Sequence, residues 1–370
     1  MSWPLVKLKE CCQVIGGATP KRNVSEYWNS SDVSWVTPKD ISNLTVPMLD
    51  DAPEYISHAG FASCSTYLLP KGSVLLTSRA PIGNVAIAGR DMCTNQGFKS
   101  LVPGKKVDGT YLYYCMKAFS SKLQALGNGA TFKEVSKKIV EDFEIPLPPF
   151  EEQKRIAAIL DKADAIRRKR QQAIQLADEF LRAVFLDMFG DPNSNSNNVK
   201  VLPMTEIFEI KTGRLNSNAA VGGGRYPFFT CAKEVSSIDE YAFDQEALLL
   251  AGNNAQADYD VKHYSGKFNA YQRTYVLSLK NSELSYPFYK FALEYQLTNL
   301  KRVSKGSNTK YITMEIMSRT MLPVPIPSEQ RSFVNYFEKV RSLRSSADAQ
   351  SMNIGGLFRS LSHEAFAGNL

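Results

Sequence analysis

Long apolar runs, cysteine pairs and histidine clusters are all missing from this chain of 370 residues. No run of about eighteen apolar residues occurs, so we expect no membrane-spanning helix and no membrane partner. The first residues lack the basic-then-apolar order of a signal peptide. The cysteines at positions 11, 12, 64, 93, 115 and 231 form no Cys-x-x-Cys pair, and the histidines are isolated. These features argue against a zinc site or a disulfide framework and predict a cytoplasmic protein.

The motifs that usually carry catalysis are missing as well. The sequence has no P-loop, no Gly-x-Gly-x-x-Gly opening a helix and no Asn/Asp-Pro-Pro-Tyr/Phe tetrapeptide. A metal-dependent nuclease would need Pro-Asp followed by Asp/Glu-x-Lys, which together hold Mg²⁺ and a water beside the phosphate. Three tripeptides match the second half, but Pro-Asp does not occur in the sequence; they are Glu152–Lys154, Glu209–Lys211 and Asp260–Lys262. We therefore predict no catalytic residue, no metal ligand and no cofactor in this chain.

The composition is that of a globular protein with a mild excess of positive charge. Hydrophobic residues make up 44% and charged residues 22% of a chain long enough for two cores. The net charge is +7 and the isoelectric point is about 8.9. This balance is compatible with nucleic-acid binding without being diagnostic of it.

The chain contains an internal duplication with an offset of 177 residues. The offset places Gly129-Ala-Thr-Phe-Lys-Glu-Val on Gly306-Ser-Asn-Thr-Lys-Tyr-Ile. Without a gap, it then places Ile145-Pro-Leu-Pro-Pro-Phe-Glu-Glu-Gln on Leu322-Pro-Val-Pro-Ile-Pro-Ser-Glu-Gln. We refer to the second pair of segments as the leaders. A gapless register of this length predicts two copies of one module, a globular part followed by a helix.

Each leader is predicted to open a long helix. The prolines of Pro146–Pro149 forbid a helix before about Phe150, and Glu151–Glu152 place negative charge in its first turn. From Ile156 to Met188 the positions of one stripe recur in steps of four and three, the period of a coiled coil. Gly190, followed by Asp-Pro, should end the helix.

The second helix, residues 327–367, is the natural partner of the first, residues 150–190. At 1.5 Å per residue each would be about 55–60 Å long. Gly355-Gly356 in the second copy costs about 2 kcal/mol of helix propensity, so a kink or fraying is expected there. The remaining predicted domains are the globular residues 1–149, a linker over 191–198 and the globular residues 199–326.

Both globular parts are predicted to be α+β, with short mixed strands and a few helices. Residues 71–88 resemble a β-hairpin with its turn at Pro81–Asn84, residues 93–102 a strand and residues 109–126 a helix. In the second part Ala247–Asn254 parallels Val74–Arg79, and Gln272 falls opposite Gln96. The framework is therefore repeated, whereas the residues of its loops differ.

These segments resemble the DNA-specificity subunit of type I restriction–modification systems. The resemblance rests on the duplicated leader with its long helix, on Val74-Leu-Leu-Thr-Ser-Arg with Asn95-Gln-Gly-Phe, and on Gly224-Arg-Tyr-Pro-Phe-Phe-Thr-Cys with Ala247-Leu-Leu-Leu-Ala-Gly-Asn-Asn. It implies two target-recognition domains that each read half of a split site in double-stranded DNA. It also implies two antiparallel coiled-coil helices acting as a spacer between them.

The same resemblance implies partners and cofactors that this chain does not carry itself. Two methyltransferase subunits would dock on the helices, and restriction–translocase subunits could join them. The complex would use S-adenosylmethionine, ATP and Mg²⁺.

Specificity should come from Arg, Asn, Gln and Lys side chains against base edges, and affinity from cations against phosphates. For each single residue, a role in a turn or as a solvated side chain is an equal alternative. The candidates of the first domain are Thr77, Ser78, Arg79, Asn84, Asn95, Gln96, Lys99 and Lys133. Those of the second domain are Asn253, Asn254, Gln256, Tyr271, Gln272, Arg273, Lys305 and Lys310.

Two other classes of function stay open at this point. One is a self-contained nuclease or methyltransferase, which the missing motifs argue against. The other is a two-domain scaffold that binds something other than DNA. The basic run Arg167–Arg170 is more simply explained as a solvated helix face than as a DNA patch.

Overall fold

The computed structural model describes residues 3–79, 81–129, 133–194, 197 and 199–368, with side chains at 345–359 and 363 left out. Contacts divide the chain into two compact units. Unit 1 comprises Met1–Ala173 with Ala347–Leu370, and unit 2 comprises Ile174–Ser346. Both boundaries fall within the long helices, so each unit consists of a globular part and a stretch of both helices. No helix in the described ranges is long and apolar enough to cross a membrane.

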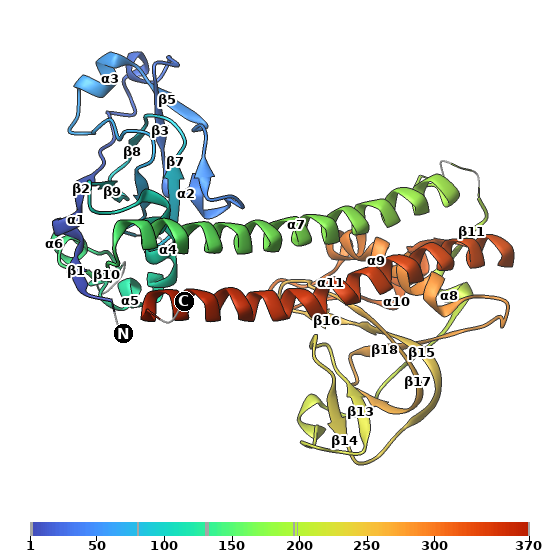
Figure 1. Ribbon diagram of the computed structural model, residues 1–370. Helices are drawn as coiled ribbons and strands as arrows, with labels where there is room; N and C mark the ends of the chain where they lie inside the picture. Colours follow the sequence, from blue (N-terminus) through green and yellow to red (C-terminus); the bar gives the residue numbers. More distant parts are fainter. Residues whose placement is uncertain (1–2, 80, 130–132, 195–196, 198, 369–370) are drawn as a thin grey trace. The chain divides into compact units, whose positions relative to one another are not determined.

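Unit 1 is built on a five-stranded sheet in the order β2-β9-β6-β7-β4, with a three-stranded sheet β5-β3-β8 and a two-stranded ribbon β1-β10 (Figure 1). Its strands are β1 Leu5–Lys7, β2 Cys12–Gly16, β3 Val33–Val36, β4 Met48–Leu49, β5 Glu54–Ile56, β6 Val74–Leu76, β7 Val85–Ala88, β8 Cys93–Thr94, β9 Lys99–Pro103 and β10 Glu144–Pro146. Its short helices are α1 Leu8–Cys11, η1 Ser25–Tyr27, α2 Pro38–Ser42, α3 His58–Ala62, α4 Gly109–Ala118, α5 Ser120–Ala125 and α6 Lys137–Glu141.

The predicted hairpin of unit 1 is confirmed, since β6 pairs antiparallel with β7. The single strand predicted over residues 93–102 is wrong. It is two strands, β8 and β9, which lie in different sheets and are separated by the turn at Asn95–Phe98. The predicted helix 109–126 is likewise divided at Phe119 into α4 and α5. Both interruptions bring a loop or a new helix direction to the rim of the sheet, which periodicity alone does not show.

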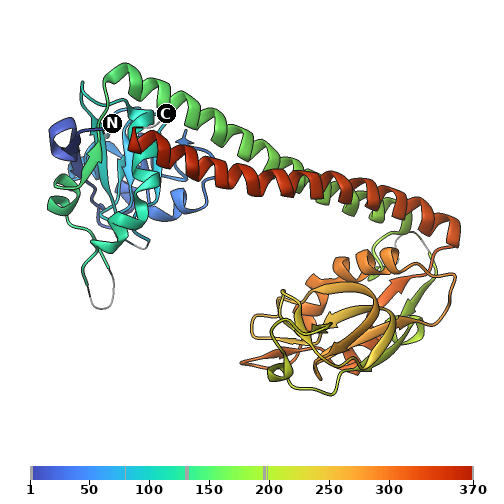
Figure 2. The same cartoon turned by 60° about the horizontal axis from the view of Figure 1, so that its bottom comes forward.

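Unit 2 has one six-stranded sheet in the order β12-β18-β15-β17-β13-β14, with ribbons β11-β20 and β16-β19. Its strands are β11 Val201–Pro203, β12 Phe208–Thr212, β13 Tyr226–Phe229, β14 Ser236–Ile238, β15 Phe243–Ala251, β16 Asn253–Asn254, β17 Val261–Ala270, β18 Thr274–Leu279, β19 Lys310–Tyr311 and β20 Met321–Pro323. Its short helices are α8 Met204–Ile207, η2 Ser217–Ala219, α9 Tyr286–Val303 and α10 Met314–Arg319. In Figure 2 the orange helix α9 lies against this sheet, and its Phe288, Tyr289 and Leu293 are fully buried there.

The duplication is visible in the pairing of strands. The leader strand β10 pairs with β1 in unit 1, and β20 pairs with β11 in the same way in unit 2. The strand pair β2-β9 likewise corresponds to β12-β18. The strand β17 of unit 2 corresponds to two strands of unit 1, β7 and β8. It pairs antiparallel with β15, as β7 pairs with β6, and parallel with β13, as β8 pairs with β3. The α+β prediction is therefore confirmed, with a continuous sheet in one unit and a divided sheet in the other.

The two long helices are α7 Phe150–Phe189 and α11 Pro327–Ala367, as the periodicity predicts. Gly190 has φ of +69° and its N–H donates to Leu186, which is the expected glycine stop. The backbone of α11 stays helical through Gly355 and Gly356, so the expected fraying is not observed.

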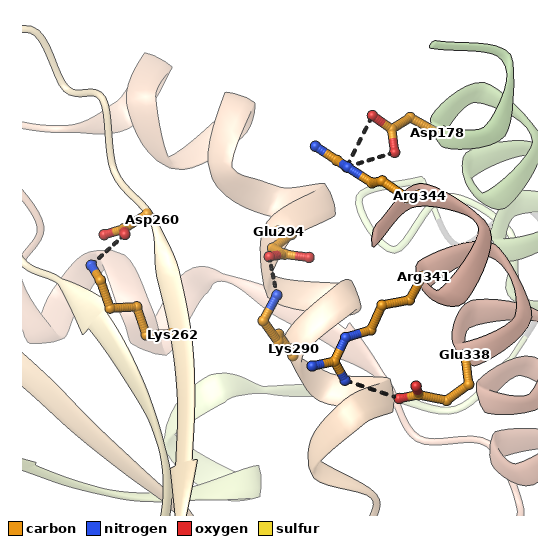
Figure 3. Close-up of polar contacts among 8 residues, drawn as sticks. All are labelled: Asp178, Asp260, Lys262, Lys290, Glu294, Glu338, Arg341 and Arg344. Atoms are coloured by element: carbon orange, nitrogen blue, oxygen red, sulfur yellow. Dashed lines mark hydrogen bonds and ion pairs between the residues drawn. The ribbon is translucent and has the colours of Figure 1, made fainter. Parts of the chain in front are cut away.

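Within each unit the stripes of the two helices meet in antiparallel fashion. In unit 1, Ile156 and Leu160 of α7 share a core with Ala365 and Phe366 of α11. In unit 2, Phe185 packs against Phe333, and Arg344 donates to Asp178 at 2.9 Å (Figure 3). The coiled-coil prediction is therefore confirmed inside each unit. Ile156, Leu160 and Leu181 of the α7 stripe are buried, and its other apolar side chains are partly exposed.

Candidate nucleic-acid interface

In unit 1, three chain segments far apart in the sequence converge on one edge. The segment after β6 is hydrogen-bonded to the segment after β8: the N–H of Ser78 donates to the carbonyl of Gly97 at 2.8 Å. The segment after β6 is also hydrogen-bonded to the segment before the leader: the N–H of Val135 donates to the carbonyl of Ser78 at 3.0 Å. Arg79 then forms a β-bridge with Glu134, which forms another with Asn128.

Unit 2 repeats this framework bond for bond. Gly252 donates to Arg273 at 2.9 Å and accepts from Ile312 at 2.9 Å, and Asn253 pairs with Tyr311. Lys305 forms the further β-bridge to Tyr311. Asn253 therefore stands where Arg79 stands, Tyr311 where Glu134 stands, and Lys305 where Asn128 stands. We call the region around Arg79, Gly97 and Glu134 in unit 1, and the region around Asn253, Arg273 and Tyr311 in unit 2, the reading edges.

A glycine allows each reading edge to close. A side chain at Gly17 would lie 2.2 Å from the carbonyl oxygens of Thr94 and Asn95, and one at Gly213 would lie 1.7 Å from that of Ala270. Both values are far below any real contact, so only glycine lets this loop approach the strand end. Gly17 and Gly213 therefore have the same role in the two units.

The reading edge of unit 1 has a carboxylate at its centre. Glu134 lies 3.4 Å from the ammonium of Lys99, 3.9 Å from the guanidinium of Arg79 and 3.5 Å from the hydroxyl of Ser78. These side chains are partly exposed, so each ion pair contributes less than about 1 kcal/mol. Arg79 and Lys99 are therefore held in place rather than buried, and both can exchange this acceptor for another.

The reading edge of unit 2 has an aromatic ring at that position. Tyr311 is exposed, and its neighbour Lys310 pairs in the ribbon with Asn254. Lys305 is exposed and forms a 2.7 Å ion pair with Glu315, which lies on α10. Below the surface, the hydroxyl of Tyr275 donates to the carbonyl of Ile312 at 2.8 Å and anchors the segment before the leader.

An exposed glutamine lies on each reading edge, at equivalent positions. Gln96 hydrogen-bonds through its side-chain oxygen with the hydroxyl of Thr19, and the side chain of Gln272 donates to that of Asn216 at 2.7 Å. Thr19 and Asn216 follow the glycine turns and were not among the residues predicted from the sequence. The sequence marks Thr19 and Asn216 only as small polar residues in turns. Their proximity to the glutamines depends on the tertiary fold.

Several predicted residues are placed in turns, where their side chains serve the backbone. Thr77 is fully buried and donates to the carbonyl of Pro81 at 2.6 Å, while Ser78 is buried beside it. The side chain of Asn84 donates to the hydroxyl of Ser42 at 3.1 Å. Asn95 and Asn254 accept from backbone N–H groups two residues onward, the geometry of an Asx turn. Of these, the partly exposed Asn84, Asn95 and Asn254 still contribute to the surface of their edges.

The remaining predicted residues are exposed or half-exposed around the two edges. Lys133 directly precedes Glu134 and is exposed. In unit 2, Gln256 and Arg273 are exposed and Tyr271 is half-buried, with its N–H donating to Phe229. Both edges therefore present amides and cations, which can hydrogen-bond to polar ligands and attract phosphates.

The nuclease-like tripeptides have structural roles. Lys262 forms an ion pair with Asp260 (Figure 3) and donates to the carbonyl of Ala232. Lys211 pairs with Glu209 at 2.9 Å. Among the residues the structure describes, no group of three or more His, Cys, Asp or Glu side chains is arranged to hold a metal ion. Lys211 and Lys262 are thus engaged by the carboxylates of their own tripeptides, whereas Lys154 pairs with Glu151, outside its tripeptide, at 3.0 Å.

The basic run on α7 is partly neutralised by a buried carboxylate. Asp164 is 1% exposed and accepts from Arg167 at 2.9 Å and from Arg168 at 3.1 Å. Lys117 of α4 approaches it at 3.5 Å, and burial lowers the pKa of that ammonium. The helix-face interpretation of the run accounts for these contacts, because two of its cations are engaged inside unit 1.

Comparison with known proteins gives one family and a consistent fold. The family described as type I restriction modification DNA specificity domain matches residues 2–176 and again residues 196–347. The MjaIX specificity subunit of Methanocaldococcus jannaschii is 36% identical over 191 residues, which cover 51% of this chain and 44% of that protein. The EcoDI specificity subunit of Escherichia coli is 41% identical over 133 residues, covering 35% and 28%. The chain thus spans less than half the length of these two relatives.

Two solved structures share the fold across the whole chain. The S subunit of a type I restriction–modification system from Mycoplasma genitalium aligns with a TM-score of 0.64 and 15% identity, covering 99% of this chain and 96% of that one. A chain from a type I restriction–modification assembly aligns with a TM-score of 0.56 and 18% identity, covering 100% and 98%. At these identities the likeness concerns the fold alone.

Proposed function

This chain belongs to the type I restriction modification DNA specificity family, and from that membership we propose that it is the DNA-recognition subunit of a type I complex. Each unit would read one half of a bipartite site in double-stranded DNA, and α7 with α11 would set the distance between the halves. The catalytic steps would be performed by partner subunits, with S-adenosylmethionine for methylation and with ATP and Mg²⁺ for translocation and cleavage.

One observation carries the assignment of the DNA-contacting surface. The two reading edges repeat the same backbone hydrogen bonds, yet place different side chains on them: Arg79 against Asn253, Glu134 against Tyr311. A framework held constant while its exposed side chains change is what two readers of different sequences require. A scaffold that binds one kind of partner twice would instead repeat the side chains.

The two kinds of contact can be separated by mutation in unit 2. A cation against a phosphate contributes to binding of every sequence, so Lys310→Ala should weaken binding uniformly and lower the salt slope by about 1. An amide against a base edge contributes to one sequence only. Gln272→Ala should therefore cost about 1–3 kcal/mol on the cognate duplex and relax the preference at one base pair.

These expectations can be measured with the chain co-expressed with its methyltransferase partner. Binding of cognate and scrambled duplexes is followed across a salt series, with Lys339→Ala on the exposed face of α11 as the matched control. Binding without salt dependence and without sequence preference would refute the proposed function. Equal effects of Lys310→Ala and Lys339→Ala would remove Lys310 from the interface.

We also propose where a methyltransferase subunit docks on unit 2. Exposed apolar side chains occur on both helices, at Leu176 and Phe180 on α7 and at Leu343 on α11, which is 69% exposed; the ring of Phe180 also contacts that of Tyr336. Large apolar side chains left exposed on a helix pair are candidates for contact with a partner. We infer that this partner is the methyltransferase subunit, because that subunit must reach the DNA beside the recognition unit.

Leu343→Asp is expected to weaken assembly with the methyltransferase subunit by about 2 kcal/mol, the loss typical of an interface hot spot. Asn335→Asp introduces the same charge at another exposed position of α11 and serves as the control. Both variants should keep the thermal stability of the parent chain, because neither side chain is buried. Assembly of Leu343→Asp with parental affinity, measured by titration of the purified subunits, would contradict this docking surface.

A further inference from the structure

A buried glutamine joins each leader to the globular part of its own unit. Gln153, in the first turn of α7, is 1% exposed. Its side-chain oxygen accepts from the N–H of Asp108 at 2.8 Å. Its amide donates to the carbonyls of Lys106 and Pro148, both at 2.9 Å. Every polar position of this amide except one acceptor lone pair is therefore used.

The same join occurs in unit 2. Gln330, in the first turn of α11, is also 1% exposed. It accepts from the N–H of Ser285 at 2.9 Å and donates to the carbonyl of Pro325 at 2.9 Å. Asp108 and Ser285 are the N-cap residues of α4 and α9, so in both units the glutamine ties the start of a core helix to the start of a long helix.

A tyrosine from the same core helix completes the join. The hydroxyl of Tyr111 donates to the carbonyl of Pro146 at 2.7 Å, and that of Tyr289 to the carbonyl of Pro323 at 3.2 Å. Both rings are fully buried, and burial raises the pKa of each phenol, so both remain protonated donors. We call Gln153 with Tyr111, and Gln330 with Tyr289, the leader latches.

The latches lie at the first turn of each long helix, where a small change in helix direction produces a large displacement at the far end. A helix of the length of α7 extends about 60 Å at 1.5 Å per residue. A change of about 5° in its direction at the first turn would displace its far end by about 5 Å. That displacement exceeds the rise of about 3.4 Å between successive base pairs. An apolar residue would fill the same volume, but directed hydrogen bonds restrict the angle as well.

We propose that the leader latches are positioning devices that make the complex selective for the distance between the two half-sites. This inference rests on the proposed function, because it concerns the spacing of the sites that the units would read. The latches touch neither reading edge, so they act on the distance between half-sites and not on the sequence of either.

The experiment measures methylation by the assembled complex on duplexes whose half-sites stand at the native spacing and at one base pair more or less. Gln153→Glu keeps the acceptor for Asp108 and replaces the two donors by an oxygen facing two carbonyls. Tyr111→Phe removes one hydroxyl without changing the packing. Glu151→Gln, at a side chain that is 84% exposed, makes the reverse exchange two residues away and is the control.

The expected result is a ratio of native to shifted spacing that falls about tenfold in Gln153→Glu, the factor that loss of one or two buried hydrogen bonds represents. Tyr111→Phe should lower the ratio in the same direction, and Glu151→Gln should leave it unchanged. The preferred sequence of each half-site should be the same in every variant.

Two results would overturn the inference. Equal loss of methylation at all spacings would show that the latch only stabilises the fold, and an unchanged ratio in a folded Tyr111→Phe would show that the latch does not restrict spacing. If Gln153→Glu fails to fold, the ratio in Tyr111→Phe decides alone. If the parent complex shows no bipartite preference at all, the proposed function fails and not the latch.

Discussion

Phe185→Ala is expected to destabilise unit 2 by about 3–5 kcal/mol, the usual cost of deleting a buried phenyl ring. Phe185 is fully buried, and its ring lies 5.3 Å from those of Phe189, Phe291 and Tyr295 and 5.5 Å from that of Phe333. It is the residue at which α7, α9 and α11 meet. No neighbour can relax into the cavity without disturbing another aromatic contact.

Phe180→Ala provides the matched control, because Phe180 lies on the same helix and is 48% exposed. It should lower the stability by only about 0.5–1.5 kcal/mol, because the exposed ring loses its pair with Tyr336 at 6.4 Å and creates no buried cavity. Unfolding can be followed by far-ultraviolet circular dichroism, which reports both units. It can be followed in parallel by tryptophan fluorescence, which reports unit 1, since all three tryptophans lie there. Equal midpoints for Phe185→Ala and Phe180→Ala would contradict this account of the core.

Replacing residues 1–149 by the corresponding domain of another family member is expected to change one half of the recognised site and leave the other half unaltered. Each unit has its own core and its own reading edge, and the leader enters each through the same latch. Every base pair changed in the original half-site should then cost about 1–3 kcal/mol with the parent chain and nothing with the chimera.

The methylated sequence in DNA from cells that carry the chimera gives the measurement. The reciprocal exchange of residues 199–326 should alter the other half only. Loss of the complete site, or a change in both halves, would show that the units do not read independently.

The long elements of this fold could be predicted from the sequence, because their signals are local and repeated. The prolines of the leader and the stripe from Ile156 to Met188 predict α7, and the offset of 177 residues predicts α11 from α7. The hairpin β6-β7 follows from two apolar runs around a proline-glycine turn. In these cases the residues that determine the structure are neighbours in the chain.

The finer placements could not be predicted, because they depend on contacts between distant segments. Nothing local shows that Thr77 and Ser78 are buried under the segment before the leader. Gln96 and its partner Thr19 are 77 residues apart in the sequence, and Gln272 and its partner Asn216 are 56 residues apart. In the sequence Gln153 is only one residue of a repeated motif. Its hydrogen bonds to Asp108 and Lys106 depend on the tertiary fold.

The carboxylate at the centre of the reading edge of unit 1 would affect how strongly that unit binds its half of a DNA site. Glu134 already occupies Arg79 and Lys99, so a phosphate or a guanine must displace an internal competitor before unit 1 gains anything from those cations. On the edge of unit 2 the ring of Tyr311 is exposed beside Lys310, and Lys305 is the cation held by a carboxylate, that of Glu315 at 2.7 Å. Under the proposed function, Arg79 and Lys99 would contribute to binding only where their contacts with DNA are stronger than those with Glu134, so this carboxylate would make binding by unit 1 more dependent on the sequence.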